Sequence, residues 1–229
     1  MIALIALFLA CISSGLATFE GEATAYGDSW QGHNCGFTEV PTKAQTYFAA
    51  INAPQWISGE NCGRCARVTY STSKCKKGKT IDVFITDQCP ECKEGDLDLS
   101  NTGFQELTGS TPSRYPITWD WIDCATAGFV SGNIELYLKE GSNPYWFAFQ
   151  PRNFLKSIAS IEMSVGGNTI TLQAPHENYI SSFYFLGEAS PGITGEIKFT
   201  LTATDGDTKE FTVSGLWTAG TSYDTGVQF

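Results

Sequence analysis

Apolar residues recur along this chain in short alternating or continuous runs, a pattern typical of β-strands. Gly, Asn and Asp residues between the runs favour turns. Only residues 42–51 and 100–107 look helical, and Ser100 stands where it can cap the second helix. The pattern predicts a mainly β fold, with a compact β-barrel followed by a β-sandwich. The predicted strands are residues 66–70, 81–86 and the segment around 117–119, and then residues 134–138, 158–165, 169–172, 197–202 and 210–213.

The distribution of cysteines and aromatic residues predicts two domains. Every cysteine lies at or before Cys124, whereas residues 134–229 contain no cysteine and carry fifteen aromatic residues. Residues 127–133 are mostly small and turn-forming, as in a short linker. We therefore expect a first domain of residues 18–126 and a second of residues 134–229, held in contact by this linker.

The N-terminal segment predicts export. Residues 2–12 form an uncharged apolar run that is too short to span a bilayer comfortably, and small residues follow it up to Ala17. We expect residues 1–17 to be a secretory signal cleaved near Ala17, and a mature protein that is secreted and has no membrane segment.

Removal of that signal would take away Cys11 and leave seven of the eight cysteines. In an oxidising compartment, seven cysteines predict three disulfides and one remaining thiol, with a connectivity that spacing alone does not define. The pairs Cys62-x-x-Cys65 and Cys89-x-x-Cys92 also resemble a four-thiolate zinc site. Export favours disulfides, so we expect no metal and no cofactor.

The acidic charge balance argues against a nucleic-acid partner. The formal net charge is -10, and the one basic cluster, residues 74–79, is interpreted as a solvated loop.

Two carboxylates are candidates for chemistry on a glycosidic bond. Asp87 ends an apolar run and Asp98 is flanked by leucines, so partial burial could keep a proton on one of them. The alternative interpretation is structural, with Asp87 in a turn and Asp98 at a helix entry. His33 and His176 look isolated, which leaves a nucleophilic triad or a metal site without support.

Aromatic and hydroxyl side chains suggest contacts with sugars. Thr24 and Tyr26 lie in a predicted strand near the mature N-terminus, and Tyr145 and Trp146 follow a turn containing Pro144. Rings on a sheet surface can stack on pyranose faces, but neighbouring strand residues normally face opposite sides of a sheet.

Taken together, these motifs resemble the expansin and expansin-like family over almost the whole mature chain. Residues 21–27 are similar to its entry strand, and residues 34–37 and 61–65 to its first cysteine signatures. Residues 86–100 are similar to the segment that carries its two central aspartates, and residues 139–153 to the start of its binding domain.

The resemblance implies a six-stranded double-psi β-barrel followed by an immunoglobulin-like sandwich that binds cellulose. It assigns the main role in wall loosening to Asp98, with Thr24, Tyr26 and Asp87 in the same groove. A third platform aromatic is less defined, with His176 or Tyr179 as candidates. The other implied binding residues are Lys139, Tyr145 and Trp146, and the implied disulfides are Cys35 with Cys62, Cys65 with Cys124, and Cys75 with Cys89 or Cys92.

The departures from the family pattern favour the microbial or slime-mould type. Cys89 stands where some relatives have an aromatic residue, and Asp96-Leu97-Asp98 replaces the plant His-Phe-Asp motif.

The resulting hypothesis is a secreted monomer, not an enzyme, that binds cellulose with associated β-glucan or hemicellulose and disrupts noncovalent polysaccharide contacts. The first alternative is an inverting endo-β-glucanase, for which Asp28 is the nearest candidate base. The second is a carbohydrate-binding or inhibitory module without loosening activity.

Overall fold

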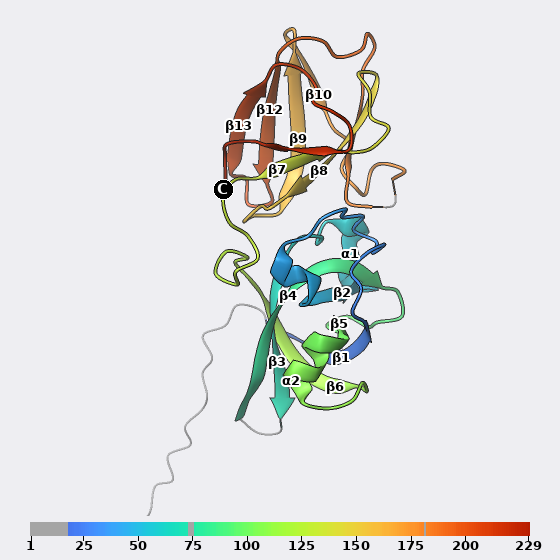
Figure 1. Ribbon diagram of the computed structural model, residues 1–229, viewed down its shortest axis with the longest axis vertical. Helices are drawn as coiled ribbons and strands as arrows, with labels where there is room; N and C mark the ends of the chain where they lie inside the picture. Colours follow the sequence, from blue (N-terminus) through green and yellow to red (C-terminus); the bar gives the residue numbers. More distant parts are fainter. Residues whose placement is uncertain (1–17, 73–75, 181) are drawn as a thin grey trace, which may run out of the picture.

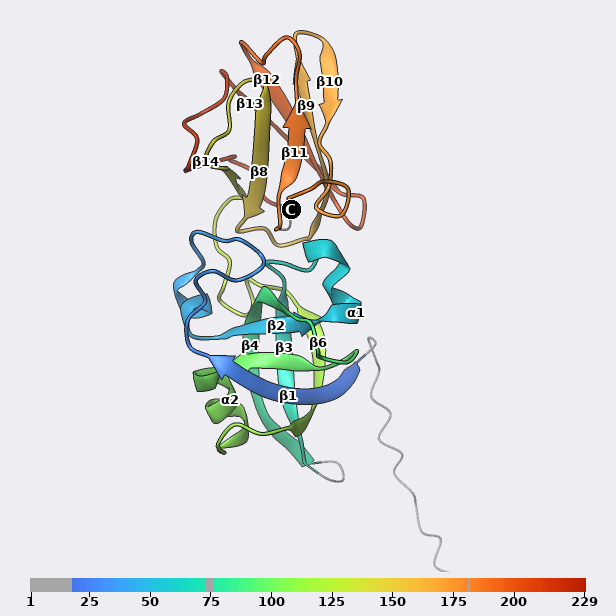
Figure 2. The ribbon, with the colours of Figure 1, turned by 90° about the vertical axis from the view of Figure 1, so that its right-hand side faces the viewer.

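The computed structural model describes residues 18–72, 76–180 and 182–229. It consists of a closed barrel and a sandwich of two sheets, stacked end to end along the long axis of the molecule (Figures 1 and 2). The predicted signal segment, residues 1–17, lies outside the described residues. None of the helices in the described ranges combines the length and apolar character needed to cross a membrane.

The six barrel strands follow the order β1-β5-β2-β4-β3-β6. Strand β1 pairs in parallel with β5, and β2 in parallel with β4, while the remaining neighbours are antiparallel. Alternate residues of each strand point inward and fill the barrel with aliphatic side chains around Trp119. The strands are β1 (Phe19–Gly27), β2 (Phe48–Asn52), β3 (Cys65–Thr72), β4 (Lys76–Cys89), β5 (Leu97–Ser100) and β6 (Tyr115–Ile122).

The prediction of a helix over residues 100–107 agrees with α2 (Asn101–Thr108) to within one residue. Ser100 caps it, because its Oγ accepts a hydrogen bond from Gly103 N at 3.1 Å. The prediction over residues 42–51 is wrong. Only a 3-10 turn, η1 (Thr42–Gln45), forms there, and strand β2 follows it. Every residue of β2 is buried between β4 and β5, so tertiary pairing overrides the helix propensity of its two alanines. Two more short turns follow, α1 (Ala53–Trp56) and η2 (Ile57–Gly59).

The second half forms two four-stranded antiparallel sheets that pack face to face. One has the order β10-β9-β12-β13 and the other β11-β8-β7-β14. Phenylalanine rings fill the space between them, among them Phe147, Phe149 and Phe199. The strands are β7 (Glu135–Leu138), β8 (Trp146–Arg152), β9 (Ile158–Val165), β10 (Asn168–Thr171), β11 (Phe185–Glu188), β12 (Ile197–Ala203), β13 (Thr208–Val213) and β14 (Thr221–Asp224).

The two domains share a packed interface. Cys35 and Cys62 of the barrel belong to the same buried cluster as the sandwich phenylalanines. The carbonyl of Cys35 accepts hydrogen bonds from Phe183 N at 3.3 Å and from Gln150 Nε2 at 3.0 Å. Side-chain packing and hydrogen bonds therefore hold the two domains together, in addition to the linker.

The described residues contain three disulfides. Cys35–Cys62 and Cys65–Cys124 are the pairs that the resemblance implied. The third corrects the remaining expectation, because Cys89 bonds to Cys92 and so neither is joined to Cys75. The three-residue spacing places the two sulfurs together once the turn after β4 forms. Cys75 itself lies outside the described residues.

Candidate functional site

One row of side chains crosses four barrel strands on the outer surface. In the strand registers, Thr24 of β1 lies opposite Asp98 of β5, Asp98 opposite Ala50 of β2, and Ala50 opposite Asp87 of β4. Adjacent strands are about 4.8 Å apart, which places the backbones of the two aspartates roughly 10 Å apart. The row thus collects Thr24, Asp87 and Asp98, which are separated by up to 74 positions in the sequence.

Asp98 is half-buried and held by one strong contact. Thr24 Oγ1 donates a hydrogen bond to Asp98 Oδ1 at 2.6 Å. Burial raises the pKa of Asp98 above its usual value, and the Thr24 hydrogen bond opposes that rise. Glu91 adds a smaller upward contribution to the pKa. The carboxylate keeps unused acceptor positions, since a carboxylate can accept about four hydrogen bonds.

Asp87 is oriented by backbone donors. Its Oδ1 accepts hydrogen bonds from Asn34 N and Gln88 N, both at 2.9 Å. Its other oxygen, Oδ2, lies 3.8 Å from His33 Nε2. Asp87 therefore fixes the loop that contains Asn34 against the end of β4, in addition to lining the groove.

His33 is a site residue that the sequence interpretation missed by treating it as isolated. Its Nδ1 lies 2.9 Å from Thr86 Oγ1 and 3.5 Å from the Tyr26 hydroxyl. Its ring packs edge-on against Phe48 with centroids 5.1 Å apart. Burial lowers the pKa of His33, and Asp87 opposes that change. Only the fold brings the partners together, since Thr86 and Asp87 are more than fifty positions away.

Tyr26 lies over the same cluster. Its ring contacts both His33 and Phe48, with centroid distances of 5.4 and 5.9 Å. Burial raises the pKa of its hydroxyl far above the usual value, and the nearby Asp87 adds to this effect. Tyr26 is still 38% exposed, so part of it remains open to solvent.

A small residue and a disulfide form the floor between the two aspartates. Ala50 packs with Cys89 and Cys92 in a buried cluster. Ala50 itself is only 2% exposed.

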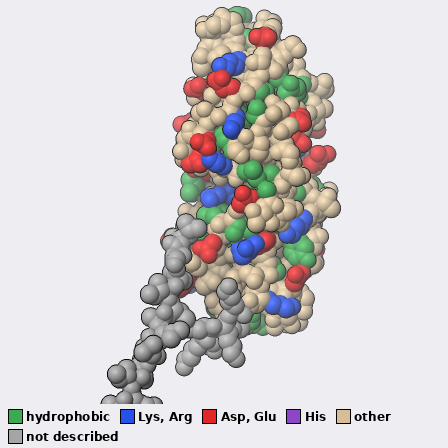
Figure 3. Space-filling view, turned by 90° about the vertical axis from the view of Figure 1, so that its left-hand side faces the viewer, with side chains coloured by type: hydrophobic (Ala, Val, Ile, Leu, Met, Phe, Trp, Pro, Cys, Tyr) green, Lys and Arg blue, Asp and Glu red, His purple; other side chains and the backbone are tan. Residues whose placement is uncertain are grey.

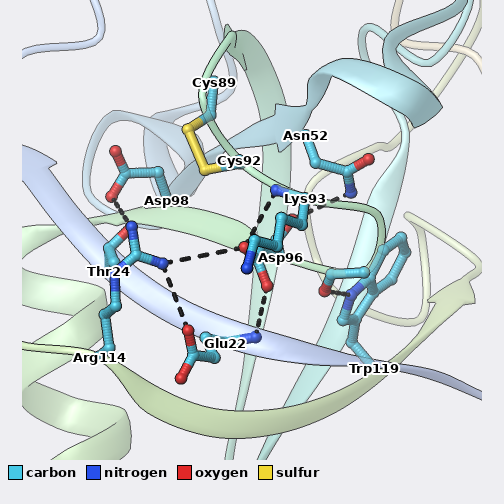
Figure 4. A network of polar contacts seen from close by, with 11 residues as sticks. Glu22, Thr24, Asn52, Cys89, Cys92, Lys93, Asp96, Asp98, Arg114 and Trp119 are labelled. Carbon is cyan, nitrogen blue, oxygen red and sulfur yellow. Dashed lines mark hydrogen bonds and ion pairs between the residues drawn. A yellow bond between two sulfur atoms is a disulfide. The ribbon is translucent and has the colours of Figure 1, made fainter.

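A polar network holds the strand that carries Asp98 (Figure 4). Asp96 is buried, and its carboxylate accepts hydrogen bonds from Glu22 N at 2.8 Å and Lys93 N at 3.1 Å. Arg114 lies 3.3 Å from the Glu22 carboxylate and 4.0 Å from that of Asp96. Asp96 is therefore a structural neighbour of Asp98, and its oxygens are occupied by the backbone.

The candidate base of an endoglucanase has another role in this structure. Asp28 Oδ1 accepts a hydrogen bond from Thr102 N at 2.9 Å, at the start of α2. Asp28 lies four residues beyond Thr24, or roughly 13 Å further at the rise of a strand. The position does not favour a shared site with Asp98.

The sandwich presents an aromatic pair at the start of β8. Trp146 Nε1 donates a hydrogen bond to the Tyr179 hydroxyl at 2.6 Å, and Tyr179 is 72% exposed. The two rings belong to segments 33 residues apart. Beside them, Lys139 Nζ lies 5.9 Å from the centre of the Tyr184 ring. Of the two candidates for the third aromatic, Tyr179 is the one in contact with Trp146.

Tyr145 is exposed but is placed differently from its neighbour. Its ring lies against Gly192, where an added Cβ would come within 3.0 Å of the ring. Asn143 Oδ1 accepts hydrogen bonds from both Tyr145 N and Trp146 N and so fixes the turn before β8. The structure therefore brings Trp146 and Tyr179 together, with Tyr145 at the margin.

A cleft of about 410 Å³ lies between the groove and the aromatic pair. Asn34 and Gln88 line it from the barrel, and Asn178 and Tyr179 line it from the sandwich. At its edge His176, the other candidate, is an interdomain contact whose Nδ1 lies 2.6 Å from Glu60 Oε1. The Asp87 end of the groove and the Tyr179 surface thus border the same hollow.

The described residues contain no group of three or more side chains suited to hold a metal ion. The proposed zinc thiolates, Cys62, Cys65, Cys89 and Cys92, are all in disulfides, which contradicts that alternative. On the side of the molecule seen in Figure 3, positive and negative side chains are interspersed.

Comparisons with known proteins agree with this architecture. A family model described as lytic transglycolase matches residues 48–119, within the barrel. Expansin-YoaJ of Bacillus subtilis is 29% identical over 203 residues, which are 89% of this chain and 81% of that protein. Expansin-like protein 5 of Dictyostelium discoideum is 26% identical over 69% of this chain, and the match covers 66% of its own length.

Solved structures show the same fold. The crystal structure of a Clavibacter michiganensis expansin matches with a TM-score of 0.74 and 23% identity, covering 93% of this chain and 98% of that one. A mutant of that protein, solved in complex with cellohexaose, also matches with a TM-score of 0.74, at 22% identity.

Proposed function

We propose, from the premise that this chain belongs to the expansin and expansin-like family, that it binds cellulose and loosens polysaccharide contacts without hydrolysis. The proposal places it outside the cell after removal of residues 1–17, and three disulfides are consistent with an oxidising compartment. Residues 18–126 would carry the groove, and residues 134–229, joined by 127–133, would carry the aromatic surface.

The observation that carries this proposal is the Thr24–Asp98–Ala50–Asp87 row. In this row Asp98 retains free acceptor positions and Asp87 is bound by backbone donors. A sugar hydroxyl can donate to Asp98 while a neighbouring glucan chain is displaced. Cellohexaose in the related Clavibacter complex supports a β-glucan as the ligand class.

The aromatic pair would anchor the chain. Trp146 and Tyr179 offer ring faces on which pyranoses can stack, and Lys139 and Tyr145 lie at the margins of this surface. The cleft lined by Asn34 and Tyr179 would let one glucan pass from this anchor to the groove.

The test of the Asp98 role is an Asp98→Asn variant assayed for creep of a cellulose-based wall under load. We expect creep to be strongly reduced while retention on cellulose persists. Asp205→Asn is the matched control, because Asp205 is exposed on the sandwich and its partner Lys156 also contacts Asp207. Unchanged creep in Asp98→Asn would contradict the assignment.

The endoglucanase alternative is tested on the same samples. Release of reducing sugar from soluble β-glucan that disappears in Asp98→Asn would favour hydrolysis. We expect no such release, because Asp28, the candidate base, is held by Thr102 N at the start of α2 instead of lying beside Asp98.

The binding-module alternative is tested by the full chain with Trp146→Ala and Tyr179→Ala together. We expect loss of retention on crystalline cellulose and loss of creep. Full creep in the non-binding variant would contradict the anchoring role, whereas wild-type retention without any creep would favour a binding module.

A further inference from the structure

The barrel has a second hollow, on strands that continue around it from the Asp98 row. This trough, of about 850 Å³, runs over the outer faces of β6, β3 and β4. Tyr47 and Glu106 line one wall, and the Tyr47 hydroxyl donates a hydrogen bond to Glu106 Oε2 at 2.7 Å. Except for β4, these strands differ from those of the Asp98 row.

Two ordered rows of polar side chains form the floor of the trough. Thr69 of β3 lies opposite Thr118 of β6 and Thr80 of β4. Each threonine is therefore about 4.8 Å from the next across the strands. This interval is close to the length of one sugar unit in an extended β-1,4-linked chain.

The second row is Asp120, Arg67 and Asp82, in the same registers. Arg67 binds Asp82 through two parallel hydrogen bonds, Nε to Oδ1 at 2.7 Å and the terminal nitrogen to Oδ2 at 2.9 Å. Asp120 Oδ1, in contrast, is buried and has no hydrogen-bond partner among the described residues. A buried acceptor without a donor is costly to keep, and Asp120 also lines the trough, so its carboxylate would gain from a donor that a ligand brings.

The charges of the trough favour a neutral donor. Asp82 and Glu106 are already partnered by Arg67 and Tyr47, and Lys43 donates to Ala127 O at 2.6 Å. Among the described lining residues three carboxylates stand against two cations, so an anionic polymer would meet a net negative charge. A sugar hydroxyl can donate to Asp120 and accept from a threonine without introducing charge.

We propose that this trough is a second carbohydrate-binding site, which takes a neutral β-linked glycan chain lying across the three strands. One threonine hydroxyl would meet each successive sugar, and one sugar hydroxyl would donate to the Asp120 carboxylate, which lines the trough. The barrel could then hold two polysaccharide chains, one in the Asp98 row and one in the trough. The site is independent of the groove and the aromatic pair, so it goes beyond the proposed function.

The test is a titration of the full isotope-labelled chain with cellohexaose, followed by NMR at every backbone amide. We expect perturbed amides around Thr69, Thr80 and Thr118 in addition to those of the groove. Thr69→Val should weaken binding at the trough roughly 2- to 10-fold, as expected for one lost hydrogen bond. Thr69→Ser, which keeps the hydroxyl, should retain it.

Two further variants separate a site from a structural role. Asp120→Asn should weaken the trough response without lowering the urea midpoint, and Thr212→Val on the exposed face of β13 should change neither. Perturbations confined to the groove and the aromatic surface at saturating cellohexaose would overturn the proposal, as would an unchanged trough response in Thr69→Val. The double variant Asp98→Asn with Trp146→Ala should leave the trough response intact. This result distinguishes a failure of the trough proposal from a failure of the proposed function.

Discussion

Replacing Thr24 by valine would remove one hydroxyl and test the electrostatics of the groove. Valine keeps the shape and the strand preference of threonine. The lost contact is the 2.6 Å hydrogen bond to Asp98 Oδ1. Hydrogen bonds to a charged partner contribute about 1.5–3 kcal/mol, and neutral ones about 0.5–1.5 kcal/mol. Because Asp98 is half-buried and water can replace part of the contact, we expect a cost near the lower end of each range.

The sign of the pH dependence follows from the pKa of Asp98. Burial raises that pKa, and Thr24 opposes the rise, so the variant should raise the pKa of Asp98 further. At pH 7 the carboxylate is charged, and Thr24→Val should lower the free energy of unfolding by about 1.5 kcal/mol. At pH 3 the acid is neutral, and the loss should fall to about 0.5 kcal/mol.

The assay is urea unfolding of wild type and variant at both pH values, with a carbon-13 titration of the Asp98 carboxyl. Creep is also measured from pH 8 down to pH 4. The part of the creep that depends on charged Asp98 should disappear at a higher pH in the variant than in wild type. Thr212→Val is the control for loss of an exposed strand hydroxyl. Equal losses at pH 7 and pH 3, or an unmoved Asp98 titration, would refute the reasoning.

Three other outcomes are expected. Asp98→Asn should raise the free energy of unfolding at pH 7, because it removes a carboxylate whose pKa burial raises. This gain in stability should shrink as the pH falls toward 3.8. Urea unfolding at several pH values measures the gain, and a gain that does not change with pH would contradict this cause. Burial lowers the pKa of His33, so its contribution to stability is present above pH 6.5 and is lost as the pH falls below that value. His33→Asn should therefore flatten this part of the plot of unfolding free energy against pH. A plot as steep as that of wild type would contradict this role of His33. Gly21→Ala should destabilise by about 3 kcal/mol, because its Cβ would lie 2.2 Å from the carbonyl oxygen of Gly95, and an unchanged thermal midpoint would exclude that clash.

Local pattern predicted the Ser100 cap and the strands β3, β4, β6, β7, β9, β10, β12 and β13, because alternation and capping depend on near neighbours. It did not predict β5, β8, β11 or β14. It failed for β2, where pairing on both edges decides the conformation of the segment Phe48–Asn52. Propensity carries no information on such pairing.

The site residues likewise divide into those that local motifs identify and those that depend on distant partners. Asp87, Asp98, Thr24 and Tyr26 could be chosen because they lie in recognisable motifs. His33 could not, since its partners meet it only when the barrel closes. The Cys89–Cys92 bond shows a similar limit, because spacing leaves several connectivities open and the turn after β4 decides between them.

The shared interface has a mechanical consequence. Cys35 is bonded to Cys62, its carbonyl is held by the sandwich, and its amide donates to Thr86 O at 3.1 Å. Gly63, next to Cys62, donates to Ile85 O at 2.9 Å. A force applied to the sandwich would therefore reach β4 just before Asp87, through the Cys35–Cys62 disulfide and hydrogen bonds of 2.9–3.3 Å. Residues 127–133, which link the domains, would carry little of that force. The sandwich and the barrel would then move together as one rigid unit.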